Sequence, residues 1–130
     1  MFLWCPKMIE ASKSVLVVDD DESVRRSLSK ILERAGYKVA AAGTGQEALE
    51  MVRANRFDVI LIDIKLPDVS GTELLSKLPK NRETVKIVIT GYSTVEHGAQ
   101  AADYGADDFL VKPVQPQELL RTIAARLAKL

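Results

Sequence analysis

Five apolar segments rich in β-branched residues alternate with segments of helical periodicity from Ser14 onward. The apolar segments are centred near Val17, Val39, Leu61, Val88 and Leu110. This alternation is typical of βαβ units, in which helices cover both faces of a parallel sheet. Right-handed crossovers leave few ways to wind five such units, and the common order 2-1-3-4-5 sets the first and third strands side by side. The sequence therefore predicts an α/β fold, a doubly wound (βα)5 flavodoxin-like sandwich around a five-stranded parallel sheet.

Local signals mark where the helices begin and end. Capping boxes at residues 44–47, 70–73 and 93–96 predict three helix starts. Asp21 is expected to cap the first helix, which stops at Gly36, because a helix N-terminus needs a hydrogen-bond acceptor. The last helix is expected to begin at Pro116. The faces predicted to be buried are Val24, Leu28, Ile31 and Leu32 in the first helix and Leu119, Leu120, Ile123 and Leu127 in the last.

Length and composition bound the number of domains and the classes of partner. With 130 residues, 47% of them apolar, the chain fits one domain, expected over residues 14–130. Residues 1–13 are expected to form a tail, because the apolar opening is too short for a signal sequence. Eighteen basic and eighteen acidic residues argue against direct binding of nucleic acid or an anionic membrane. The single cysteine, Cys5, excludes an intrachain disulfide and is compatible with a cytoplasmic location.

Carboxylates follow two of the apolar segments, at the point where each strand should end. Asp63 ends the run 59–63, and Asp19, Asp20 and Asp21 follow the run 15–18. In an open parallel sheet, ligands bind at these carboxyl ends, and neighbouring strands lie only about 4.8 Å apart. Two such charges about 4 Å apart repel by roughly 4 kcal/mol at an effective dielectric near 20, unless a cation offsets them. The pattern predicts a site for a hard divalent cation such as Mg²⁺.

Two further polar side chains are expected at the same edge of the sheet. Thr90 closes the fourth apolar run and Lys112 closes the fifth. Two acids, a hydroxyl and an ammonium fit phosphoryl transfer, in which Asp63 attacks phosphorus and the other groups stabilise charge on the phosphoryl oxygens. His97, the only histidine, is expected on an exposed helix surface rather than as a phosphodonor.

Taken together, these runs resemble the receiver domain of two-component response regulators. The matching stretches are residues 17–22 (VVDDDE), residue 63 with 66–68 (LPD) and 71, residues 89–91 (ITG) and residues 105–113 (GADDFLVKP). The resemblance covers about residues 14–130 and implies a phosphorylation-controlled binding module rather than a metabolic enzyme. It implies as partner a sensor histidine kinase or phosphotransfer protein, whose phosphohistidine would donate to Asp63.

The resemblance also implies a role for each site residue. Asp20, Asp63 and the backbone carbonyl of Lys65 would bind Mg²⁺ directly, and Asp19 would act through water. Thr90 and Lys112 would hold the phosphoryl oxygens, Phe109 would be the aromatic switch residue, and the bond before Pro113 would be cis. The switching face would comprise helix 4, strand 5 and helix 5 of the family fold, through which a homodimer is a further expectation.

Two alternatives share parts of this pattern. Aspartyl-phosphate hydrolases of the haloacid dehalogenase type also use a strand-end aspartate, but they require a second aspartate two positions later, where this chain has Lys65. A lysine, with an unperturbed pKa of about 10.4, is a poor proton acceptor at neutral pH. A flavodoxin-like FMN carrier needs a neutral, amide-rich phosphate loop after the first strand, whereas residues 19–22 are all acidic.

Overall fold

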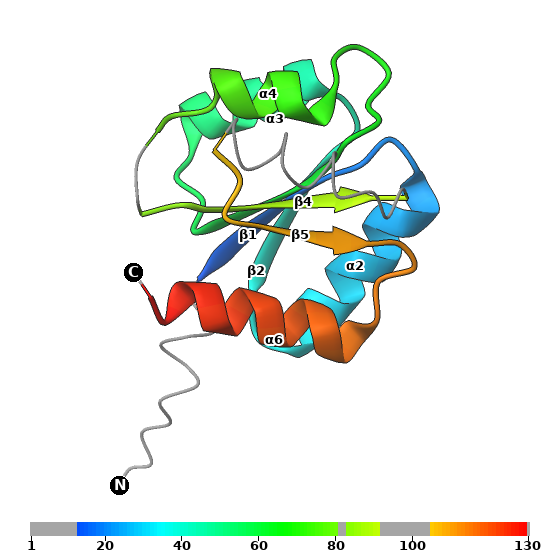
Figure 1. Ribbon diagram of the computed structural model, residues 1–130, viewed down its shortest axis with the longest axis vertical. Coiled ribbons are helices and arrows are strands. Elements are labelled where there is room, and N and C mark those ends of the chain that lie inside the picture. Colours follow the sequence, from blue (N-terminus) through cyan, green and yellow to red (C-terminus); the bar gives the residue numbers. More distant parts are fainter. Residues whose placement is uncertain (1–12, 81–82, 92–104, 130) are drawn as a thin grey trace, which may run out of the picture.

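The predicted sheet and its strand order are confirmed by a computed structural model, which describes residues 13–80, 83–91 and 105–129. Five parallel strands are paired in the order β2-β1-β3-β4-β5 (Figure 1). Their bounds are Ser14–Val18 for β1, Lys38–Ala42 for β2, Val59–Asp63 for β3, Val85–Thr90 for β4 and Asp108–Val111 for β5. The expected tail lies almost wholly outside the described residues and stays a prediction.

Helices cover both faces of the sheet (Figure 1). On one face lie α3 (Gly45–Ala54) and α4 (Gly71–Lys77), and on the other lie α2 (Glu22–Arg34) and α6 (Pro116–Leu127). Within the described residues, none of these helices combines the length and apolar character that a membrane span requires. The helix expected to begin at the capping box 93–96 falls outside the described residues, as does His97.

The helix starts follow the predicted chemistry. Asp21 caps α2 by accepting the Val24 N–H at 3.2 Å. Thr44 and Ser70 accept the N–H three residues later, each at 3.1 Å, and so cap α3 and α4. After α2 the chain reverses at Gly36, whose φ of 101° lies in the left-handed region that glycine adopts without a steric cost.

Successive side chains of each strand point to opposite faces of the sheet and so form two hydrophobic layers. In β1, Leu16 and Val18 pack in the layer under α3 and α4, whereas Val15 and Val17 pack in the layer under α2 and α6. Leu28, Leu32, Leu119 and Ile123 complete the second layer as buried residues, and the remaining predicted positions Val24, Ile31, Leu120 and Leu127 are only partly buried. Each fully buried aliphatic side chain contributes about 1.5–3 kcal/mol, so these layers hold the helices on the sheet.

Register decides what meets at the carboxyl ends of the strands. Val18, the last residue of β1, pairs with Ile62 of β3. The next residue along each chain segment, Asp19 after β1 and Asp63 in β3, therefore emerges at the same edge of the sheet. Asp63 in turn pairs with Ile89 of β4, next to Thr90. The sheet thus brings together side chains that lie far apart in the sequence.

Candidate functional site

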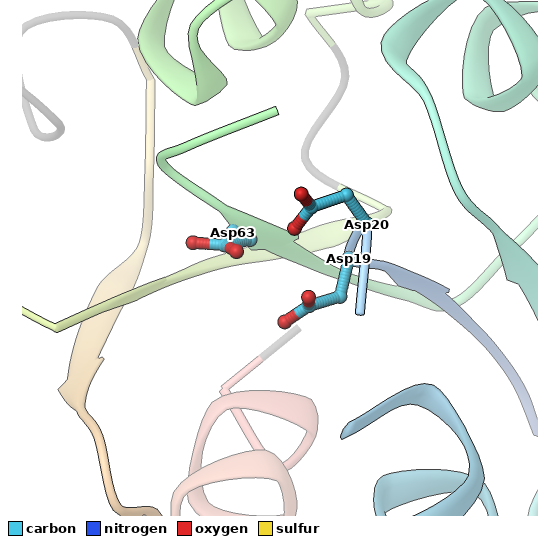
Figure 2. A group of neighbouring side chains, drawn as sticks. All are labelled: Asp19, Asp20 and Asp63. Carbon is cyan, nitrogen blue, oxygen red and sulfur yellow. The ribbon is translucent and has the colours of Figure 1, made fainter. Parts of the chain in front are cut away.

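Three carboxylates gather at the carboxyl ends of β1 and β3. Asp19, Asp20 and Asp63 each offer one carboxylate oxygen, and these oxygens all lie within 4.8 Å of one another (Figure 2). Asp19 and Asp63 are only 2% and 6% exposed, whereas Asp20 is exposed. Two of the three carboxylates are therefore buried, and the cluster reaches solvent at Asp20, where an ion can enter.

Lys112 lies between the two buried carboxylates. Its ammonium nitrogen is 3.0 Å from Asp19 Oδ2 and 3.2 Å from Asp63 Oδ2. Buried charges are tolerated when they are paired and hydrogen bonded, and this lysine meets that need for two carboxylates at once. It enters the site from the residue that follows β5, which completes an arrangement drawn from three strand ends.

Backbone groups hold the second oxygen of each buried carboxylate. Asp19 Oδ1 accepts the Asp21 N–H at 2.9 Å, and Asp63 Oδ1 accepts the Lys65 N–H at 3.2 Å. In the loop after β1, the Arg25 guanidinium also donates a hydrogen bond to the backbone carbonyl of Asp19 at 2.7 Å. Each buried carboxylate is thus oriented at both oxygens before any ligand arrives.

Burial and mutual repulsion shift the ionisation of this group. Burial is the main factor that raises the pKa of Asp63, and the Asp19 charge adds to it, while the Lys65 N–H and the Lys112 ammonium oppose the shift. Burial alone would lower the pKa of Lys112, but its contacts with Asp19 and Asp63 outweigh burial and raise it. Lys112 is therefore charged at neutral pH.

The donor set fits a hard divalent cation. Three carboxylates and one ammonium leave a formal charge of −2 in the cluster when all are ionised. The cluster offers oxygen donors, which Mg²⁺ and Ca²⁺ prefer over nitrogen and sulfur. Asp19, Asp20 and Asp63 are thus the side chains that would hold such an ion.

The other predicted site residues occupy distinct places. Thr90 ends β4 at the same sheet edge and is buried. Lys65 is exposed in the loop after β3, and its backbone pairs with Ser70 in an isolated antiparallel bridge. Phe109 is 40% exposed on β5, so its side chain is turned outward in this conformation. The Lys112–Pro113 peptide bond is cis.

Asp68 has a role that sequence reasoning did not identify. Its two carboxylate oxygens accept the N–H groups of Gly45 and Gln46, both at 2.9 Å, at the N-terminus of α3. These hydrogen bonds lower the pKa of Asp68. Because more than twenty residues separate the partners, the only sequence signal was the LPD motif itself.

Gly71 anchors the other end of the loop that contains Asp68. Its N–H donates to the Ile64 carbonyl at 2.7 Å, and a Cβ on residue 71 would come within 2.6 Å of the Asp63 carbonyl oxygen. Only glycine fits that approach without a shift of the backbone. The segment that carries Lys65 is therefore held between α3 and the end of β3.

Comparisons with known proteins agree with this arrangement. The family model "Response regulator receiver domain" matches residues 15–124. The transcriptional regulatory protein SrrA of Staphylococcus aureus is 34% identical over 118 residues, which are 91% of this chain and 49% of that protein. The chain thus spans about half the length of this relative.

Solved structures extend the similarity to three dimensions. A CheY-like receiver domain protein from Methanospirillum hungatei is 42% identical, with a TM-score of 0.85, over 90% of this chain and 94% of that one. A Burkholderia pseudomallei response regulator described with a phosphorylated aspartic acid, a calcium ion and citrate is 33% identical, with a TM-score of 0.82. That match covers 91% of this chain and 70% of that one. The chain belongs to the response regulator receiver domain family.

Proposed function

We propose that this receiver domain accepts a phosphoryl group on Asp63 from a phosphohistidine of a sensor histidine kinase or phosphotransfer protein, with Mg²⁺ as cofactor. The observation that carries the proposal is the pairing of buried Asp63 with both the acidic cluster and the Lys112 ammonium. The phosphorylated aspartic acid and calcium ion of the Burkholderia relative give it further support.

The transfer needs a carboxylate nucleophile and a way to spread charge. An Asp63 carboxylate oxygen forms the new P–O bond while the donor's N–P bond breaks, and the imidazole nitrogen keeps the electron pair. When bound, Mg²⁺ supplies positive charge to the phosphoryl oxygens. Lys112 already lies 3.2 Å from the nucleophile and would stabilise the same oxygens, with Thr90 at the adjacent strand end. Asp20, Asp63 and the Lys65 backbone carbonyl would hold the metal directly, and Asp19 would act through water.

Labelling with acetyl phosphate, which also carries a transferable phosphoryl group, tests the assignment. Borohydride trapping followed by mass spectrometry is expected to place the modification on Asp63, and Asp63→Asn should abolish it because an amide is a poor nucleophile. Glu22→Gln, which removes an exposed charge next to the acidic loop, should label normally. A label that persists on Asp20 in Asp63→Asn would contradict the choice of acceptor.

The same proposal includes a switch toward the face formed by helix 4, strand 5 and helix 5 of the family fold. Strand 5 and helix 5 of the family fold correspond to β5 and α6, which lie within the described residues. Helix 4 of the family fold corresponds to the segment 92–104, which lies outside them, and not to α4. Phe109 is turned outward, and we expect it to move inward when Thr90 approaches a phosphoryl group. A homodimer through this face and a cytoplasmic location are further parts of the proposal.

Amide hydrogen exchange with and without beryllofluoride, a mimic of the acyl phosphate, tests the switch. Protection is expected to change most in residues 91–104. Phosphorylation, or its mimic, shifts the population between two packings of the switching face because it stabilises one of them more than the other. A response limited to the acidic loops would argue against this route. The hydrolase alternative is not favoured, since the second position after Asp63 holds the exposed Lys65 rather than an aspartate.

A further inference from the structure

Lys86 occupies a position that the strand pattern assigns to the hydrophobic core. In β4, Val88 faces α3 and α4, so Lys86, two residues earlier, points to the same face. Across the sheet it pairs with Ile60 of β3, which belongs to the same apolar layer. Lys86 is only 6% exposed. The Lys86 side chain thus runs through a layer where an aliphatic side chain would normally pack, and its ammonium group reaches the cavity described below.

The neighbouring polar groups do not pair with this ammonium. Asp107 accepts the Lys86 backbone N–H at 2.7 Å, and the Lys86 carbonyl accepts the Asp107 N–H, also at 2.7 Å. Both contacts use the backbone of Lys86. Within residues 13–80, 83–91 and 105–129, the Lys86 ammonium has no hydrogen bond or ion pair. Burial accordingly lowers the pKa of Lys86, and the Asp107 charge opposes this shift.

A cavity of about 390 Å³ adjoins Lys86 at the opposite end of the sheet from Asp63. It lies between the C-terminal end of α3 and the amino ends of β3 and β4. Its walls combine apolar and polar side chains. Among its lining residues are Val52, Phe57, Ile60, Arg53, Arg56 and Lys86.

The cavity is positively charged. Arg53 lies in the last turn of α3 at the rim of the cavity. Arg56 also lines the cavity, and its charge is partly neutralised by Asp58 at 3.8 Å and Glu83 at 3.5 Å. Lys86 and Arg53 have no ion pair with an acidic residue in the described part of the chain. Ligand pockets in proteins typically hold about 300–1,000 Å³, so the volume is at the small end of that range.

We propose that this cavity binds a small organic carboxylate, whose charged group meets Lys86 while its apolar body packs against Phe57 and Ile60. The anion would supply the partner that the Lys86 ammonium lacks, and the apolar wall would favour anions that carry an apolar body. The site is separate from the phosphoacceptor cluster, and its occupation does not depend on the proposed phosphorylation.

Titration of the isotope-labelled full chain with benzoate, followed by NMR, tests the proposal. Saturable shifts in the millimolar range are expected for amides of residues 52–57, 60 and 84–86, and not for residues 19–21. Benzamide, a neutral molecule of nearly the same shape, should cause no saturable shift there. Equal effects of benzamide and benzoate, or shifts centred on the acidic cluster, would overturn the assignment.

Variants separate the role of the ammonium from that of the cavity. Lys86→Met keeps an unbranched apolar stem and should weaken benzoate binding at least tenfold, whereas Lys38→Met, which removes an exposed lysine on β2, should bind like the parent chain. Arg53→Gln, at the rim, should weaken binding by a smaller factor. Unchanged affinity in Lys86→Met would refute the proposal.

A measurement on the unmodified chain keeps the test independent of how Lys86→Met folds. The pKa of Lys86, followed through its Cε resonance, is expected to rise when benzoate is bound, because a buried anion favours the charged ammonium. Benzamide should leave it unchanged. No rise with saturating benzoate would exclude direct contact between the carboxylate and Lys86.

Discussion

The Lys112 ammonium nitrogen lies 3.2 Å from Asp63 Oδ2, although 49 positions separate the two residues in the chain. The same nitrogen contacts Asp19 Oδ2 at 3.0 Å. Before any phosphoryl transfer, Lys112 therefore offsets part of the negative charge that would otherwise attract a metal ion. It supports the folded site and at the same time competes electrostatically with the ion that the site is built to hold.

Lys112→Met should bind Mg²⁺ more tightly than the parent chain and accept a phosphoryl group more slowly. The affinity for Mg²⁺ should increase because a positive charge is removed from the cluster. A difference of about 1.4 kcal/mol would lower the Kd about tenfold. Transfer slows because one group that stabilises the phosphoryl oxygens is lost. Calorimetric titration with Mg²⁺ and acetyl phosphate labelling measure the two effects, with Lys38→Met as control. Weaker Mg²⁺ binding would contradict the electrostatic role given to Lys112.

Asp20→Asn should weaken Mg²⁺ binding by about tenfold or more, since a charged oxygen ligand becomes a neutral one. Asp20 is exposed, so the free energy of unfolding in metal-free buffer should change little. The matched control is Glu22→Gln, which removes a charge from the same acidic stretch but lies outside the three-carboxylate cluster. If both variants bind Mg²⁺ equally well, Asp20 is not a ligand.

Lys65→Ala should change the rate at which the phosphorylated chain loses its phosphoryl group, while Mg²⁺ affinity stays nearly the same. The exposed Lys65 side chain follows Asp63 by two positions and can affect access of water, whereas the metal would need only the backbone carbonyl. Lifetimes of the two phosphoproteins, measured after removal of acetyl phosphate, decide this. Identical lifetimes would count against a role for the side chain.

Asp68→Asn should lower both stability at neutral pH and Mg²⁺ affinity, because the loop that holds Lys65 loses its charged anchor at the α3 N-terminus. The pKa of Asp68 is lowered in the folded state, so its stabilisation is present above the ordinary value of 3.8 and is lost as pH falls through the folded pKa. Denaturation across that pH range should therefore show a shrinking difference between variant and parent. Glu33→Gln on α2 provides the control.

Lys86→Met should raise the free energy of unfolding at neutral pH, because a largely buried side chain that ends in an unpaired ammonium is replaced by a wholly apolar one. The folded-state pKa of Lys86 lies below its ordinary value of 10.5, so the parent chain gains stability as pH rises from the folded pKa toward 10.5. The advantage of the variant should shrink over that window. Denaturation at several alkaline pH values measures it; a constant advantage would mean that the fold does not lower the pKa of Lys86.

Local sequence indicated the elements and which polar side chains would gather at one edge of the sheet. Apolar alternation indicated the five strands, and Asp21, Thr44 and Ser70 marked helix starts because a cap needs only an acceptor three residues from its donor. Strand-end positions indicated that Asp19 and Asp63 would share an edge, because parallel strands all end on one side.

Only the tertiary structure decided which of these side chains meet. Lys112 contacts Asp19 across 93 positions, and Asp68 reaches Gly45 across 23, through hydrogen bonds that exist only once the helices have packed on the sheet. Lys86 reads in the sequence as an ordinary charged residue within a strand, and its burial beside a cavity depends on how the C-terminal end of α3 lies over β3 and β4. Strand and helix periodicities act over a few residues, whereas these contacts depend on the distances between whole elements, which no local pattern encodes.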